Sequence, residues 1–283
     1  MRAPVFAKRD AGFTLIELLA ALGIFLVITG AAFTLLTSSQ QRYQTDTQLL
    51  ISFQEARLGL DQMVRDINDA GFPPSSFLIS GSPTQVTSWP FAWSAAAGYT
   101  TSPSSSTSCQ IGTGGGGTCT TSSGDSAPGD FDIIIETAPN LPTDPYVYWI
   151  RYQLQGTVLM RGVSPKVSGG DPDAAFTGTN AMVPFVQNVV NQSCPPQLPS
   201  CQAAYPGVFQ GAAVPIFSYL CDTPTNPQTP APLCISAGAD NSSENIREVL
   251  ITLIVAAPLP DATSGQPRLV ELSGRGRRIN PNQ

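Results

Sequence analysis

The chain has 283 residues, of which 42% are hydrophobic and only 12% charged, and its formal net charge is −6. The hydrophobic share excludes a wholly disordered chain, and the acidic balance without a basic stripe argues against nucleic-acid binding. Histidine, the commonest general base and transition-metal ligand, is absent, so we expect a protein without enzymatic activity, bound metal or other cofactor.

The first 36 residues divide into a short charged segment and a long apolar run. The basic residues of the charged segment are Arg2, Lys8 and Arg9. The run covers residues 13–36 and contains Glu17 as its single charge. About 20 apolar residues span the hydrocarbon core of a bilayer, so the run predicts a transmembrane helix. Because the next basic residue after the run is Arg42, the N-terminus is expected in the cytoplasm.

Two ordinary alternatives exist for this apolar run, a cleaved secretory signal and a plain signal anchor. Residues 30–32 (GAA) imitate a secretory cleavage site, but such a signal has an apolar region of only about 7–15 residues. Neither alternative explains Glu17, because a carboxylate inside a membrane costs several kcal/mol unless it has a partner. Glu17 is therefore a candidate functional residue.

Residues 8–17 (KRDAGFTLIE) carry a motif at the start of this run. The motif resembles the N-terminal processing site of the type IV pilin family. The resemblance implies that prepilin peptidase removes residues 1–12 by cutting between Gly12 and Phe13, and that the new amine of Phe13 is methylated. It also implies that this cationic amine pairs with Glu17 of a neighbouring subunit during assembly.

The same resemblance implies the partners and the location of the protein. Membrane lipid surrounds the N-terminal helix before assembly, and other pilins or minor pilins surround it afterwards. Prepilin peptidase and the inner-membrane assembly platform are the further partners. We expect a single-pass protein of the bacterial inner membrane with a periplasmic head, which becomes extracellular within a pilus.

Residues 37–72 predict an amphipathic continuation of the helix. Apolar residues recur there at intervals of three, four and seven, namely Leu49, Leu50, Phe53, Leu60, Met63, Val64 and Ile67. Charges of alternating sign lie four apart on another face, at Arg57, Asp61, Arg65 and Asp69. This spacing predicts a solvated ladder of side-chain pairs. Gly71 and the following Pro73-Pro74 predict the end of the helix.

Residues 73–283 predict a β-rich head. Residues 73–129 are rich in Ser, Thr, Gly and Pro, which predicts a long loop region. Strand patterns occur at 131–135, 146–154, 157–163, 183–190, 246–256 and 268–272. A turn at Gln155-Gly156 joins the second and third of these strands into a hairpin. One long helix followed by strands joined through hairpins and loops predicts an α+β fold with an antiparallel sheet.

Six cysteines lie in loop-like sequence as three near neighbours, Cys109 and Cys119, Cys194 and Cys201, and Cys221 and Cys234. Sequence alone cannot choose their pairing, but proximity favours the three local disulfides. Zinc is the rival interpretation, and it lacks both a Cys-x-x-Cys spacing and a histidine ligand. Disulfides indicate an oxidising compartment, which here means the periplasm or the exterior.

Three segments carry a finer resemblance within the pilin family. Residues 63–72, the hairpin around 152–161 and the closing residues 277–280 are similar to minor pilins of the PilW type. Minor pseudopilins of the J type, from type II secretion systems, share the N-terminal motif and a related helix end. The resemblance therefore implies a minor pilin that takes part in pilus assembly or initiation, with a J-type pseudopilin as the alternative.

Two groups of carboxylates leave other functions open. Their residues are Asp171 and Asp173 in one loop, and Asp240, Asn241 and Glu244 in another. Such oxygen ligands can bind calcium, but neither group has the spacing of an EF-hand, and solvated turn residues explain both. A membrane-tethered enzyme or an adhesive module at a filament tip is less favoured than a structural subunit.

Overall fold

The computed structural model describes the chain in segments separated by gaps. The described residues are 14–72, 90–92, 128–139, 143–144, 146–167, 172–194, 201–210, 212–221, 233–234, 246–261 and 264–279. The chain forms two compact units, residues 1–47 and 48–283, and each is considered by itself. The leader and the cleavage site at Gly12 and Phe13 lie outside the described residues.

A single helix, α1 (Leu15–Asn68), contains the predicted transmembrane run and its amphipathic continuation. Its most apolar window of 18 residues has a mean hydropathy of 2.4 and is 0% buried. Within the described residues it is the one helix long and apolar enough to cross a membrane, and it fits a single-pass membrane anchor.

The helix ends at Asn68, four residues before the predicted end at Phe72. A turn follows, in which Gly71 has φ of +80°, a backbone conformation that glycine adopts without steric cost. The Gly71 N–H donates to the carbonyl oxygen of Glu136 at 2.9 Å. The predicted stop signal at Gly71 is confirmed, and it fastens the end of the helix to a strand.

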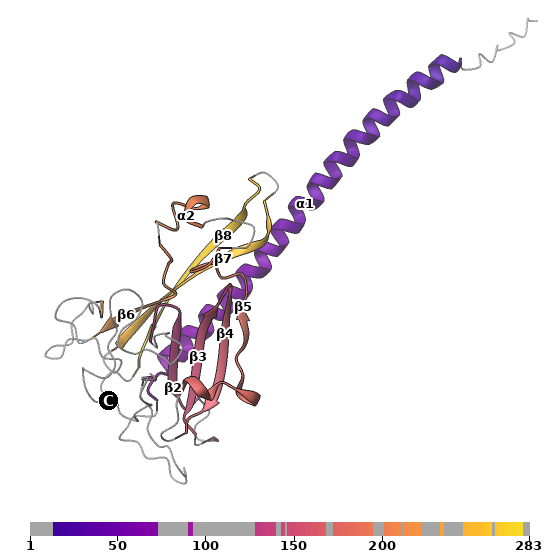
Figure 1. Ribbon diagram of the computed structural model, residues 1–283. Helices are drawn as coiled ribbons and strands as arrows, with labels where there is room; N and C mark the ends of the chain where they lie inside the picture. The colour runs from indigo at the N-terminus through magenta and orange to yellow at the C-terminus, as the bar shows by residue number, and fades with distance from the viewer. Residues whose placement is uncertain are drawn as a thin grey trace, which may run out of the picture. The chain divides into compact units, whose positions relative to one another are not determined.

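The head contains two antiparallel sheets (Figure 1). The first has the order β1-β2-β3-β4-β5, with β1 Phe91–Ala92, β2 Asp132–Thr137, β3 Tyr148–Gln155, β4 Val158–Pro165 and β5 Val183–Val186. The second has the order β6-β7-β8, with β6 Phe217–Cys221, β7 Ile246–Pro260 and β8 Pro267–Arg277. Short helical turns are η1 Asp173–Ala175, η2 Gly178–Asn180 and α2 Cys201–Ala204. The predicted α+β class is confirmed.

The hairpin of β3 and β4 has the predicted position, with its turn shifted by one residue. Gln155 pairs with Val158, so the turn residues are Gly156 and Thr157, and Gly156 has φ of +62°. The strand β7 extends beyond its predicted limits at its C-terminal end, and β8 extends beyond its predicted limits at both ends. The strands β1 and β6 were not predicted, and β1 has only two residues.

The main core of the head lies between residues of α1 and both sheets. The buried helix residues are Ala56, Leu60, Met63 and Ile67. Together with Ala70, in the turn after the helix, they join strand residues from β2, β3, β4, β6 and β7 in one cluster. Most of the predicted apolar stripe therefore packs on the head as expected. The stripe residues in this packing are Leu60, Met63, Val64 and Ile67, whereas Leu50 has 59% of its surface exposed.

Two glycines in β8 allow this strand to approach the helix closely. A Cβ atom on Gly274 would lie 2.7 Å from Cδ1 of Leu60, and one on Gly276 would lie 2.5 Å from Cγ2 of Ile67. Both separations are shorter than carbon atoms tolerate. The alternation of Gly and Arg at 274–277 thus places backbone against α1, while Arg275 and Arg277 extend from the opposite side of the strand.

A buried asparagine fastens the segment after β5 to the second sheet. The Asn191 amide donates to the carbonyl oxygens of Val214 at 3.1 Å and Thr252 at 2.8 Å, and its carbonyl accepts from the Ile254 N–H at 2.8 Å. An isolated bridge pairs Val189 with Val255 nearby. The predicted strand at 183–190 therefore contributes to both sheets.

Candidate functional site

Glu17 lies in the first turn of α1 and forms a capping box with Thr14. The carboxylate accepts from the Thr14 backbone N–H at 2.9 Å and from the Thr14 hydroxyl at 2.8 Å. The Glu17 N–H donates back to the Thr14 hydroxyl at 3.3 Å. Ser or Thr followed three residues later by Glu is the sequence pattern of this cap, which satisfies N–H groups that the helix leaves unpaired. The same carboxylate is thus the first-turn cap of its own helix.

The residues that follow this cap present an apolar surface on every side. Leu15, Ile16, Leu18, Leu19 and Leu22 are all exposed, as are the large apolar residues through Leu36. A surface of this kind is stable only against lipid or against other apolar helices. The hydroxyls of Thr29, Thr34 and Thr37, within or beside this surface, donate to backbone carbonyls one turn earlier in the helix. These bonds offset the free-energy cost of placing a hydroxyl in an apolar medium.

A polar cluster within the core attaches α1 to the first sheet. The Tyr152 hydroxyl donates to the Asp66 carboxylate at 2.5 Å, and Arg161 donates to Asp66 at 3.1 Å and to the Tyr152 oxygen at 3.0 Å. The amide of Gln62 also donates to Asp66, at 2.8 Å. Burial and the neighbouring Asp66 carboxylate raise the pKa of Tyr152 well above its usual range, so the hydroxyl keeps its proton.

The end of α1 is also bound to the C-terminal strand. The backbone N–H of Arg277 donates to the side-chain oxygen of Asn68 at 2.8 Å, and the N–H of Ile279 donates to the Asn68 carbonyl at 3.2 Å. The helix end, the β3–β4 hairpin and the closing residues are therefore in contact through Asp66 and Asn68.

Two buried ion pairs in the first sheet were not predicted from the sequence. Arg151 binds Asp132 through two side-chain contacts, one of them at 2.9 Å. Lys166 binds Glu136 at 2.7 Å, both side chains fully buried, and the Trp149 indole N–H donates to the same carboxylate at 2.9 Å. Each charge has hydrogen-bonding partners, as buried charges require, which indicates a structural role.

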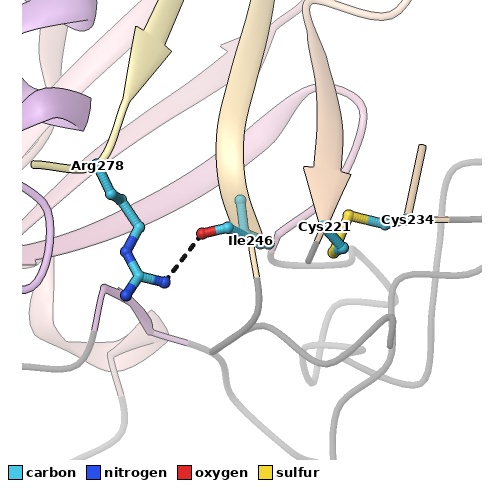
Figure 2. Close-up of a disulfide and its surroundings, with 4 residues drawn as sticks. All are labelled: Cys221, Cys234, Ile246 and Arg278. Atoms are coloured by element: carbon cyan, nitrogen blue, oxygen red, sulfur yellow. Dashed lines mark hydrogen bonds between the residues drawn. A yellow bond between two sulfur atoms is a disulfide. The ribbon is translucent and has the colours of Figure 1, made fainter. Parts of the chain in front are cut away.

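One of the three predicted disulfides is described in full. Cys221 and Cys234 are bonded with 4.8 Å between their Cα atoms, at the end of β6 (Figure 2). Figure 2 also shows Arg278, whose guanidinium donates to the Ile246 carbonyl at 2.9 Å at the start of β7. Cys194 is disulfide-bonded as well. Cys109, Cys119 and the side chain of Cys201 lie outside the described residues.

The carboxylates considered for calcium cannot be placed as a site. Asp171, Asp240, Asn241, Glu244 and the side chain of Asp173 lie outside the described residues. Within the described ranges, no group of three or more His, Cys, Asp or Glu side chains has an arrangement that could hold a metal ion.

Comparison with known families matches the N-terminal segment. Residues 7–33 match the model of the prokaryotic N-terminal methylation motif, which includes Gly12, Phe13 and Glu17. No curated protein and no solved structure matches the chain. The motif implies processing by prepilin peptidase and assembly with other pilins. Together with the capped, exposed apolar part of the helix, the motif supports a type IV prepilin-like protein.

Proposed function

We propose that this protein is a minor type IV pilin, a structural subunit that takes part in pilus assembly or initiation after its leader has been removed. The observation that carries the proposal is Glu17, the single charge on an exposed apolar helix, four residues from the expected new N-terminus at Phe13. A carboxylate in lipid needs a cation, and the amine of a neighbouring subunit's N-terminus supplies one.

The proposed role is structural rather than catalytic. The chain holds no histidine, and the buried charges of the described head are engaged in pairs that hold strands and helix together, such as Arg151 with Asp132 and Lys166 with Glu136. These contacts support a head whose polar groups stabilise the fold.

The proposed place of the head is the periplasm, and the exterior within a pilus. The disulfide between Cys221 and Cys234 supports an oxidising compartment. The basic residues before the apolar run, Arg2, Lys8 and Arg9, support a cytoplasmic N-terminus.

Head size supports a minor rather than a major subunit. The second compact unit extends over residues 48–283 and contains two sheets. A head of this size, with the weakly charged sequence at 73–129, would crowd a lattice in which thousands of copies pack at close axial spacing. A subunit that is used a few times at an initiating or tip complex avoids this constraint.

Quantitative proteomics of sheared filaments tests the proposal, together with deletion of the gene. We expect this chain at a small fraction of the most abundant pilin, and fewer filaments of normal architecture after deletion. An abundance equal to that of every other pilin would show a major subunit instead. Unchanged filaments with lost protein secretion would favour the alternative, a J-type pseudopilin of a type II secretion system.

A further inference from the structure

A pocket of about 410 Å³ lies in the head where the end of α1, the end of β2 and the residue beyond β8 come together. Its lining includes Asn68, Asp69, Phe72, Thr137, Ala138 and Ile279. Pockets that bind ligands or partner side chains have volumes of about 300–1,000 Å³, so the space is large enough for one or two side chains.

Backbone hydrogen bonds hold the three walls of this pocket in place. The Ala138 N–H donates to the Phe72 carbonyl at 2.8 Å, and the Ile279 N–H donates to the Asn68 carbonyl at 3.2 Å. The bond from Gly71 to Glu136 adds a further link between helix end and strand. A pocket built in this way is formed before binding, which lowers the entropy lost when a partner docks.

The walls of the pocket include exposed apolar residues. Phe72 is 38% exposed and Ile279 is 68% exposed, although both are large apolar residues. Large apolar side chains that remain exposed side by side mark contact surfaces for other proteins.

Negative charge lies at the rim. Asp69 is exposed, and within the described residues no cation lies at ion-pair distance from its carboxylate. The C-terminus of α1 and the nearby Asp66 add to the negative potential. Desolvation and the Asp66 charge raise the pKa of Asp69, which agrees with a carboxylate that lacks a cation.

We propose that this pocket is a docking site for another pilin-like subunit, which inserts an apolar side chain between Phe72 and Ile279 and places an adjacent Lys or Arg on Asp69. The inference rests on the proposed function, because assembly with other pilins supplies the partner. The basic residue is inferred from the negative charge of Asp69, and its apolar neighbour from the exposed side chains of Phe72 and Ile279.

A photo-reactive amino acid in place of Ile279 tests this site in the full-length protein in its native cells. After irradiation we expect an adduct with another pilin-like subunit, in which the cross-linked peptide contains an apolar residue beside Lys or Arg.

Asp69→Lys should reduce the yield of this cross-linked adduct by about tenfold or more, because like charges then face each other. The matched control is Asp61→Lys, which makes the same charge change at an exposed position of α1 outside the pocket and should leave the yield unchanged.

Three results would overturn the inference: adducts only within the same chain, adducts to a segment without a basic residue, or a yield that Asp69→Lys does not change. Incorporation of the irradiated protein into filaments is measured in parallel. Normal incorporation without the expected adduct refutes this docking site alone, whereas failure to enter any filament or pseudopilus refutes the proposed function and the docking site with it.

Discussion

At the scale of single residues, Glu17 caps its own helix, and the proposed function gives it a second role. Its carboxylate caps the first turn of α1 through Thr14, and in the proposed assembly it also neutralises the amine of a neighbouring subunit. The spacing of Thr14 and Glu17 is that of a capping box, so the sequence could have predicted this cap. The sequence-based prediction considered only the charge of Glu17. Because a cap needs only an acceptor oxygen while the amine needs a charge, substitution can separate the two roles.

Glu17→Gln keeps an acceptor for the Thr14 N–H and removes the charge. We predict normal membrane insertion and a loss of filament incorporation of about tenfold or more, because removing one partner of a buried ion pair costs about 3–5 kcal/mol. Thr14→Ala keeps the charge and weakens the cap by about 1 kcal/mol, so incorporation should change little. The measurement is the ratio of filament-bound to membrane-bound protein. Normal incorporation of the Gln variant would contradict the pairing role.

The polar cluster around Asp66 makes a second prediction at this scale. Asp66→Ala leaves Arg161 and the Tyr152 hydroxyl without their shared carboxylate, so the head should lose about 3 kcal/mol of unfolding free energy. Asp61→Ala, on the exposed side of α1, should change it by less than about 0.5 kcal/mol. Urea denaturation of the detergent-solubilised chain measures both. Equal stability of the two variants would show that the cluster does not hold helix and sheet together.

Sequence patterns placed polar residues on the helix, but they did not predict which distant residues these side chains bind. Asp66 lies within the predicted helix, but its partners Tyr152 and Arg161 follow 86 and 95 residues later, beyond the reach of helical spacing. The charges at Arg57, Asp61, Arg65 and Asp69 are exposed as predicted, yet among the described contacts they form no ion pairs with one another. Instead the Arg65 guanidinium donates to the Asp61 backbone carbonyl at 3.4 Å, since water competes for exposed charges.

At the scale of elements, local patterns predicted most of the helix and the long strands. Periodicity defined α1 and alternation defined the hairpin, because both are properties of neighbouring residues. The packing partner of a strand depends on residues far away in the chain. Gly274 and Gly276 look like poor strand residues, and the predicted strand consequently ended at Leu272, whereas β8 continues to Arg277 because the glycines make room for Leu60 and Ile67.

This close approach predicts an overpacking defect. Gly276→Ala places a methyl group 2.5 Å from Cγ2 of Ile67, so the head should lose about 1–3 kcal/mol of stability. Gly207→Ala is the matched control, because a Cβ atom at Gly207 has no heavy atom within 4 Å. Thermal unfolding of the two variants side by side gives the comparison. A melting temperature of the Gly276 variant as high as that of the control would refute the packing argument.

At the scale of the whole molecule, the two compact units correspond to two environments. The first contains the exposed apolar part of α1, which requires lipid or other helices, and the second has its own core of helix and sheets. Composition predicted other boundaries, an apolar run at residues 13–36, its amphipathic continuation at 37–72 and a β-rich head at 73–283. Composition could not predict that the head divides into two sheets, because this division depends on long-range contacts such as those of Asn191.

The N-terminus of the mature protein provides the most direct test of the prepilin-like character of the chain. Mass spectrometry of protein from membrane and filament fractions should identify Phe13 as the first residue, with a methylated amine and without residues 1–12. The control is Glu17→Gln, which leaves Gly12 and Phe13 intact and should be cleaved at the same bond. An intact Met1 in the mature protein, or a first residue of Phe33 after cleavage behind Ala32, would contradict the account.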